Sequence, residues 1–133
     1  MKRLMIIAAV VALLCACQES LEQRVQREAR EYTAKYCPTP VDNHTRTDSV
    51  VFDMTTRTYH YYCSVVDILD NEEVFALNRD KMAASLLKLV RENTGFRGFK
   101  KAGFSFAWTI RSEKDPKKVY FNKVYTPSEY NNQ

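Results

Sequence analysis

The chain has 133 residues, of which 27% are charged and 45% hydrophobic, a composition typical of one small globular domain. It holds 20 basic and 16 acidic residues, a formal net charge of +4, and removal of Lys2 and Arg3 with the leader described below would leave 18 against 16. Charges of both signs are interspersed, apart from a short basic run at Arg97, Lys100 and Lys101. Nucleic-acid binders concentrate basic residues on one face, so the composition argues against nucleic acid as a partner.

The N-terminal segment has the pattern of an export leader. Lys2 and Arg3 precede an uninterrupted apolar run over residues 4–14. A transmembrane helix needs about 20 apolar residues, so this run is too short to anchor the protein by itself. We therefore expect residues 1–16 to be removed on export.

The leader ends in Leu14-Cys15-Ala16-Cys17, which resembles the lipobox of bacterial lipoproteins. Cys17 is preceded by a small residue, whereas Cys15 would follow the bulky Leu14, so Cys17 is the expected lipidated residue. The resemblance implies a diacylglyceryl thioether on Cys17 and an acylated amino group, which together give a stable membrane anchor. The alternative is an ordinary secretory signal cut near Ala16.

Residues 17–19 would then form the lipidated N-terminus with a short tether, and residues 20–133 a single domain. Gln18, where an Asp would mark retention in the inner membrane, favours the outer membrane of the cell envelope. Whether the domain faces the periplasm or the outside is left open.

The first predicted helix covers residues 21–36. Ser20 and Gln23 match a capping box, and the apolar residues that follow recur every three or four positions: Leu21, Val25, Ala29, Tyr32 and Tyr36. Cys37 and Pro38 end the helix.

Alternating side chains predict two strands of a hairpin, over residues 49–54 and 59–65. The alternation places Cys63 on the apolar face, where it could meet Cys37 at the end of the helix. An exported chain enters an oxidising compartment, so we expect a Cys37–Cys63 disulfide. It would stabilise the fold by about 3 kcal/mol.

In the second half we expect a helix over residues 79–93, after a polar break at 70–73 and with Gly95 as its C-cap. A period-two run then predicts a strand over 104–111, followed by a charged turn at 113–118 and a strand over 119–125. The order helix, strand, strand, helix, strand, strand suggests a loose duplication of one unit.

The predicted fold class is α+β: a two-layer sandwich of four antiparallel strands with both helices on one face. The other face would be open and would carry His60, Tyr62, Ser64, Ser105, Ala107 and Thr109. We expect Tyr62 and either Tyr120 or Tyr125 to be exposed. Aromatic residues on an open face can bind peptide or glycan, although they more often pack into a core. The candidate binding face is His60, Tyr62, Ser64 and Thr109.

No residue pattern points to catalysis. His44 and His60 lack a second ligand at metal-binding spacing, and Cys37 and Cys63 are better explained as a pair than as nucleophiles. The chain has no G-x-S-x-G elbow, and the segment from Gly95 to Gly98 is no phosphate loop. We expect no enzyme activity, no cofactor and no metal.

The segment 37–53 (CPTPVDNHTRTDSVVFD), the Tyr-rich stretch 58–63 and the segment 124–130 resemble small uncharacterised lipoproteins of the Bacteroidota. The resemblance covers most of the chain after the leader. It implies an envelope location and an αββαββ-like layout, and it brings no activity with it.

These observations favour a non-enzymatic binding or assembly module, attached to the membrane by its lipid and contacting another envelope protein through its sheet face or edge. The alternative is an inhibitor or sensor domain of the PepSY-like or protease-inhibitor type. An enzyme would need a polar pocket with a titratable pair, which the sequence does not display.

Overall fold

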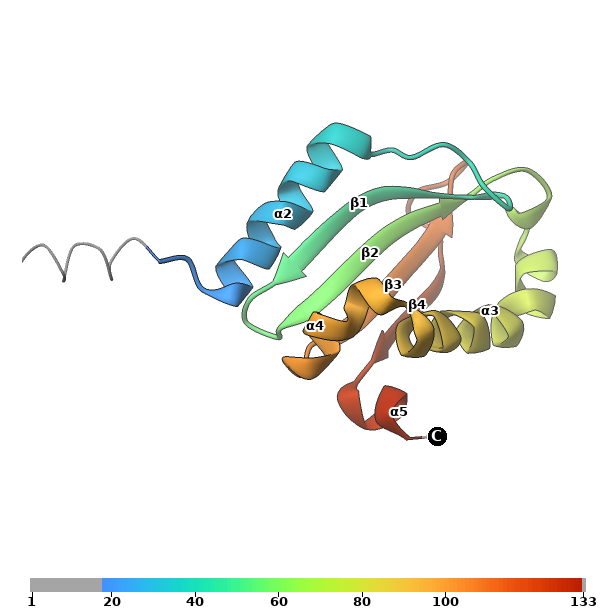
Figure 1. The fold of residues 1–133 in the computed structure, drawn as a ribbon. Coiled ribbons are helices and arrows are strands. Elements are labelled where there is room, and N and C mark those ends of the chain that lie inside the picture. The colour runs from blue at the N-terminus through green and yellow to red at the C-terminus, as the bar shows by residue number, and fades with distance from the viewer. Residues whose placement is uncertain (1–17, 133) are drawn as a thin grey trace, which may run out of the picture.

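The computed structural model describes residues 18–132, which form a four-stranded sheet in the order β1-β2-β3-β4 with helices packed on it (Figure 1). The predicted α+β class is confirmed. Cys17 and the leader lie outside the described residues. In the described part no helix combines the length and the apolar character needed to cross a membrane. The elements are α2 (Leu21–Tyr36), β1 (Thr45–Asp53), β2 (Thr58–Val65), α3 (Glu72–Glu92), α4 (Arg97–Lys101), β3 (Ser105–Ser112), β4 (Val119–Tyr125) and α5 (Pro127–Asn131), with 3-10 turns η1 (Asp67–Leu69) and η2 (Thr94–Phe96).

Helix α2 has the predicted bounds, and its capping box is present: the Ser20 side chain accepts a hydrogen bond from the Gln23 amide at 3.1 Å. Val25 and Ala29 are buried against β1. The Thr33 hydroxyl donates to the Val50 carbonyl and accepts from the Val50 amide, both at 2.9 Å. These bonds attach α2 to the free edge of β1 and satisfy backbone groups that an edge strand leaves exposed.

Strands β1 and β2 form the predicted antiparallel hairpin, although β1 begins four residues earlier than expected. Its pairing shifts between Thr47 and Ser49, so Asp48 occupies a β-bulge. An isolated bridge between Asp42 and Thr45 closes a tight turn ahead of the strand. The hairpin therefore starts directly from this turn.

The prediction of a wholly antiparallel sheet is wrong, because β2 and β3 pair in parallel. The cause is the length of α3, which has 21 residues and begins at Glu72 instead of Arg79. At 1.5 Å per residue such a helix is about 31 Å long, enough to return the chain to the end of the sheet where β2 began. Parallel strands need a crossover of this kind. The two outer strands, β1 and β4, therefore run in one direction and the two inner strands in the other.

Two asparagines cap α3, Asn71 through its side chain at the start and Asn93 through its backbone amide at the end. The Asn71 side chain accepts hydrogen bonds from the Glu73 and Val74 amides at 3.0 and 3.1 Å, which starts the helix inside the predicted polar break. The helix ends at Glu92 with Asn93 as its C-cap. The assignment of Gly95 as C-cap is therefore wrong, and this glycine lies in η2.

The helices cover the sheet face that carries Phe106, Trp108 and Ile110 of β3. Tyr61 stacks on Trp108 with ring centroids 4.9 Å apart, and Phe106 is fully buried. The remaining large contributors come from α3, η2, α5 and β4: Phe75, Val90, Phe96, Tyr130, Phe121 and Tyr125. In Figure 1, α2 runs beside β1, while α4 lies in front of the ends of the inner strands β2 and β3.

The prediction that Tyr120 or Tyr125 is exposed is wrong. Tyr125 is fully buried and its hydroxyl donates to the Ala83 carbonyl at 2.8 Å, while the Tyr120 hydroxyl donates to Asp70 at 3.0 Å. A buried tyrosine needs such a partner for its hydroxyl. Helix α3 supplies the first partner, and Asp70, two residues before that helix, supplies the second.

Candidate functional site

The candidate site is the sheet face opposite the helices. Among the described residues, every helix packs on the face that carries Phe106 and Trp108. His60, Tyr62 and Ser64 of β2 and Thr109 of β3 alternate with core residues and so lie together on the other face. The structure therefore places the four predicted residues on one face of the sheet, with Ser64 and Thr109 buried there.

His60 is the centre of this surface. Its ring stacks on Tyr62 with centroids 4.1 Å apart and an interplanar angle of 9°. Its Nε2 lies 2.7 Å from the Thr109 hydroxyl oxygen, and that hydroxyl donates to Asn122 Oδ1 at 3.2 Å. Because the Thr109 proton is used on Asn122, Nε2–H is the donor to Thr109. The lone pair of a neutral His60 ring is then on Nδ1.

Burial lowers the pKa of His60 below its usual value, against a smaller opposing effect of the Asp53 carboxylate. The imidazole is therefore neutral at pH 7. It offers one acceptor nitrogen and a flat ring face, and it carries no charge that an ionic ligand would seek.

Ser64 has a structural role at the end of the face. Its hydroxyl donates to Asp48, whose other oxygen accepts from Arg46 Nε at 2.9 Å. Arg46 also pairs with Glu113 at 3.2 Å between Nη1 and Oε1. Ser64 is 4% exposed, so it is closed to a ligand and instead holds the bulge of β1 against β2.

Two valines that the sequence did not single out complete the surface. The register places Val51 of β1 beside His60, and Val124 of β4 beside Ala107, in one row across all four strands. Val51 is 47% exposed and Val124 is 45% exposed, while Ala107 is fully covered by its neighbours. We call Val51, His60, Tyr62 and Val124 the open-face band.

The band has the chemistry of a binding surface. No group of three or more His, Cys, Asp or Glu side chains among residues 18–132 is placed to hold a metal ion. The hydrogen bond of His60 goes to the Thr109 hydroxyl, and the Asp53 carboxylate acts on the ring only through its charge. What the band offers a ligand is apolar contact area, an aromatic stack and one hydrogen-bond acceptor.

The two cysteines lie on the helix side of the sheet. Cys37 caps α2, and Cys63 is buried on β2, 3.9 Å from the Thr47 hydroxyl between Sγ and Oγ1. Both are free thiols in the structure. Burial raises the pKa of Cys63 to about 11, against a smaller lowering by its contact with the Thr47 hydroxyl. A thiol with this pKa is protonated at neutral pH and is a poor nucleophile.

The family described as "Domain of unknown function (DUF8479)" matches residues 20–121. The chain belongs to this family. The matched range runs from the cap of α2 into β4, so this DUF8479 domain includes His60, Tyr62, Ser64, Thr109 and Val51 within the part that defines the family. Val124 lies just beyond it.

Three solved structures share the fold. One is a crystal structure of a Pseudomonas aeruginosa protein assigned as secreted, 15% identical, with a TM-score of 0.67 over 85% of this chain and 99% of that one. The second is EpsS, the pilotin of the type 2 secretion system of Vibrio vulnificus, at 12% identity and a TM-score of 0.66 over 85% and 94%. The third is the type II secretion pilotin AspS of Vibrio cholerae, at 13% and 0.60 over 82% and 91%. No curated protein matches the chain.

Proposed function

We propose that this DUF8479 domain is a non-enzymatic module of the cell envelope that is anchored by lipid at Cys17 and holds another envelope protein on its open-face band. The observation that carries the proposal is the exposure of Val51 and Val124, which flank a stacked His60–Tyr62 pair on a face that no described helix covers. Exposed apolar side chains gathered in one place mark interaction sites.

The chemistry of the band indicates an amphipathic protein segment as its ligand. Val51 and Val124 offer apolar contacts on the two outer strands of the sheet, with the aromatic pair between them. The next row of the same face is polar and includes Ser49, Thr109 and Asn122. A segment that lays apolar side chains along the valine row would present polar groups to this second row and to Nδ1 of His60.

The comparisons support the location and the kind of role. Two proteins with this fold are pilotins of type II secretion systems, and a third is assigned as secreted. The shared fold makes an assembly role in the envelope a reasonable choice for this domain. The lipobox-like end of the leader independently favours export and anchorage.

The partner site is tested by photo-crosslinking in living cells. A photoreactive amino acid replaces Val51 or Val124, and in a matched control it replaces Leu77, which is 86% exposed on α3. We expect both band positions to yield the same crosslinked envelope protein and Leu77 to yield none. Identical products from all three positions, or none from the band, would contradict the proposed site.

The anchor is tested separately by metabolic labelling with palmitate and by mass spectrometry of the mature N-terminus. We expect incorporation of label into the natural chain and none into Cys17→Ser. An unmodified sulfur on the mature chain would rule out the anchor while leaving the band proposal standing.

We also propose that Cys37 and Cys63 form a disulfide once the chain is exported. Support comes from the end of α2: Thr39, two residues after Cys37, donates its amide to the Thr47 carbonyl at 2.9 Å, and Thr47 pairs with Cys63. Thiol alkylation before and after reduction is the test. We expect both thiols to react only after reduction, and reduction to lower the free energy of unfolding by about 3 kcal/mol.

A further inference from the structure

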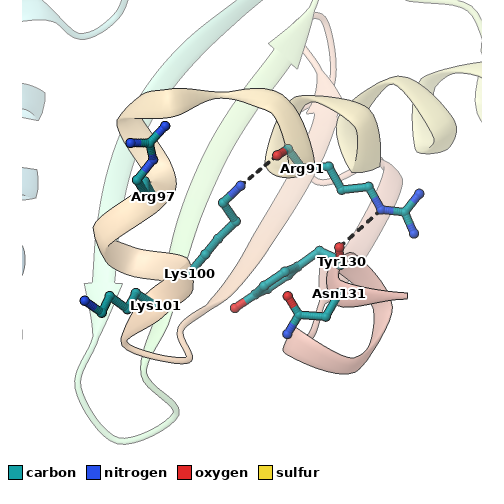
Figure 2. Close-up of a pocket in the computed structure, with 6 residues that line it drawn as sticks. All are labelled: Arg91, Arg97, Lys100, Lys101, Tyr130 and Asn131. Atoms are coloured by element: carbon teal, nitrogen blue, oxygen red, sulfur yellow. Dashed lines mark hydrogen bonds between the residues drawn. The ribbon is translucent and has the colours of Figure 1, made fainter. Parts of the chain in front are cut away.

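A hollow of about 330 Å³ at the junction of α3, α4 and α5 gathers four basic side chains (Figure 2). Arg91 comes from the last turn of α3, while Arg97, Lys100 and Lys101 come from α4. None of the four takes part in a salt bridge within residues 18–132. Glu92, which follows Arg91 in the sequence, is exposed and adds one negative charge beside these four positive charges.

Two of the cations are held in place by backbone carbonyls. Lys100 Nζ donates to the Arg91 carbonyl at 2.7 Å, and the Arg91 guanidinium donates to the carbonyls of Glu129 and Tyr130 at 3.0 and 3.3 Å and to that of Asn132. Carbonyls at helix C-termini favour cations, but they neutralise only part of the charge. The hollow thus has a fixed positive lining.

The other two cations are available to a ligand. Arg97 and Lys101 are exposed, and neither side chain makes a hydrogen bond within the described residues. In Figure 2 they extend from α4 on the side away from Arg91. A planar guanidinium and a mobile ammonium beside a basic hollow fit the phosphate oxygens of an anionic ligand.

The hollow lies at the end of the domain from which the chain leads to Cys17. Arg57, in the turn between β1 and β2, donates to the carbonyl of Ala102 at 2.8 Å and pairs with Glu22 at 3.3 Å. Ala102 directly follows Lys101, and Glu22 lies five residues after Cys17. Five residues span at most about 18 Å. Figure 1 shows the start of α2, this turn and α4 at the same end of the sheet.

The carboxylates at the start of α2 do not cancel this charge. Glu19 pairs with Arg27 at 2.9 Å, and Glu22 pairs with Arg57. Asp53 at the end of β1 and Glu92 at the end of α3 make no salt bridge among the described residues, so the four basic groups of the hollow exceed these two free carboxylates by two.

We infer that the basic hollow, formed by Arg91, Arg97, Lys100 and Lys101, binds the anionic phospholipid headgroups of the membrane that holds the anchor. The inference rests on the proposed lipid anchor, because the tether at Cys17 is what brings the hollow to the membrane. Screening limits such attraction to about 8 Å at physiological salt, so it acts only when the domain lies against the bilayer. Binding would fix the orientation of the domain, and so of its sheet, relative to the bilayer.

The experiment uses the mature lipidated protein in vesicles of phosphatidylcholine, with or without one quarter phosphatidylglycerol. A water-soluble acylating reagent labels lysines, and peptide mass spectrometry compares Lys101 with Lys117, which lies in the β3–β4 turn at the other end of β3. Flotation of the vesicles reports the anchor independently. We expect labelling of Lys101 to slow at least threefold in the anionic vesicles only, and Lys117 to label equally in both.

Charge reversal supplies the matched control. We expect Arg97→Glu to abolish the protection of Lys101 and Lys117→Glu to leave it intact, with equal melting temperatures showing that both variants fold. Each Lys or Arg near an anionic surface changes binding by about fivefold, so one reversal is measurable. Protection that persists in Arg97→Glu would overturn the inference.

The remaining outcomes are also decisive. Equal labelling of Lys101 in both vesicles, in protein that floats, overturns the headgroup site and leaves the anchor intact. Protection by inorganic phosphate in neutral vesicles overturns it in favour of a free anion. If the protein floats with neither vesicle, both proposals fail. Flotation with the anionic vesicles alone refutes the anchor and with it the premise that the tether brings the hollow to the membrane.

Discussion

The two faces of strand β3 differ in almost every physical respect. Toward the helices it presents Phe106, Trp108 and Ile110, all of them in the core. Toward the other side it presents Ala107, Thr109 and Arg111, between the His60–Tyr62 stack of β2 and the exposed side chains of β4. The first face is filled by large apolar groups, whereas on the second the side chains are small or polar and Thr109 hydrogen-bonds to His60 and Asn122.

The difference indicates that the two faces of β3 have separate roles. On the helix side each large side chain removes apolar area from water, which stabilises the fold by about 25 cal/mol for each Å² buried. On the open side Ala107 and Thr109 are covered by neighbouring rings and add little area of their own. Stability is therefore expected to depend on the first face and recognition on the second, and the following predictions test this division.

The largest effect is expected for Phe106→Ala on the helix side. Phe106 is fully buried and packs against Phe96 and Tyr130, with ring centroids 4.7 and 5.8 Å away. Its truncation should lower the free energy of unfolding by about 3 to 5 kcal/mol. Urea unfolding followed by Trp108 fluorescence measures the loss. A loss below 1 kcal/mol would show that the helix side is not the stabilising face.

A smaller loss is expected for Asp70→Ala at the end of the helix side. The Asp70 carboxylate accepts from the Lys114 amide and from the Tyr120 hydroxyl, both at 3.0 Å. Burial alone would raise its pKa, but these bonds and the Ser112 hydroxyl hold the pKa below its usual value. Removal leaves buried donors without partners and should cost about 1 to 3 kcal/mol.

The sign of the pH dependence at Asp70 follows from its lowered pKa. A carboxylate with a depressed folded pKa contributes stability above its unfolded pKa, and this contribution disappears as the pH falls through the folded value. Urea unfolding at pH 7 and at pH 3 should therefore differ less in Asp70→Asn than in the natural chain. If the loss of stability between pH 7 and pH 3 were the same in both proteins, a group other than Asp70 would cause it.

The sequence predicted the parts of the fold that depend on local signals. The capping box and the apolar spacing predicted α2, and the charged turn at 113–118 marked the start of β4, both with the observed bounds. The early turns of α3 were missed because an exposed Leu77 interrupts its apolar stripe. The parallel pairing of β2 with β3 was missed because it depends on the full length of α3, and the sequence pattern predicted a shorter helix.

The candidate site was predicted only in part, for the same reason. Alternation along β2 was enough to place His60, Tyr62 and Ser64 on one face. Val51 and Val124 belong to different strands, and only the register across the sheet puts them in the row of His60. The burial of Ser64 could not be predicted either, because it depends on a hydrogen bond to Asp48, which lies in a bulge of a different strand.

A modest effect is expected from His60 on the open face. Its folded pKa is lowered, so the unfolded chain binds the proton more readily, and stability falls as the pH drops below the unfolded value of about 6.5. Chemical unfolding at pH 7.5 and 5 should show a smaller difference in His60→Gln than in the natural chain.

The smallest effect on stability is expected for Val51→Asp and Val124→Asp. Each valine is about half exposed on the open side, so a carboxylate there stays hydrated, and surface substitutions of this kind usually change stability by no more than about 0.5 kcal/mol. The same change places a charge in the middle of an apolar contact with the proposed partner, where an unpaired and desolvated charge is strongly unfavourable. Urea unfolding and in-cell crosslinking from the unchanged valine position should therefore diverge, with stability retained and the crosslink lost. If stability fell with the crosslink, the open face would be supporting the fold, and the division between the two sides of β3 would fail.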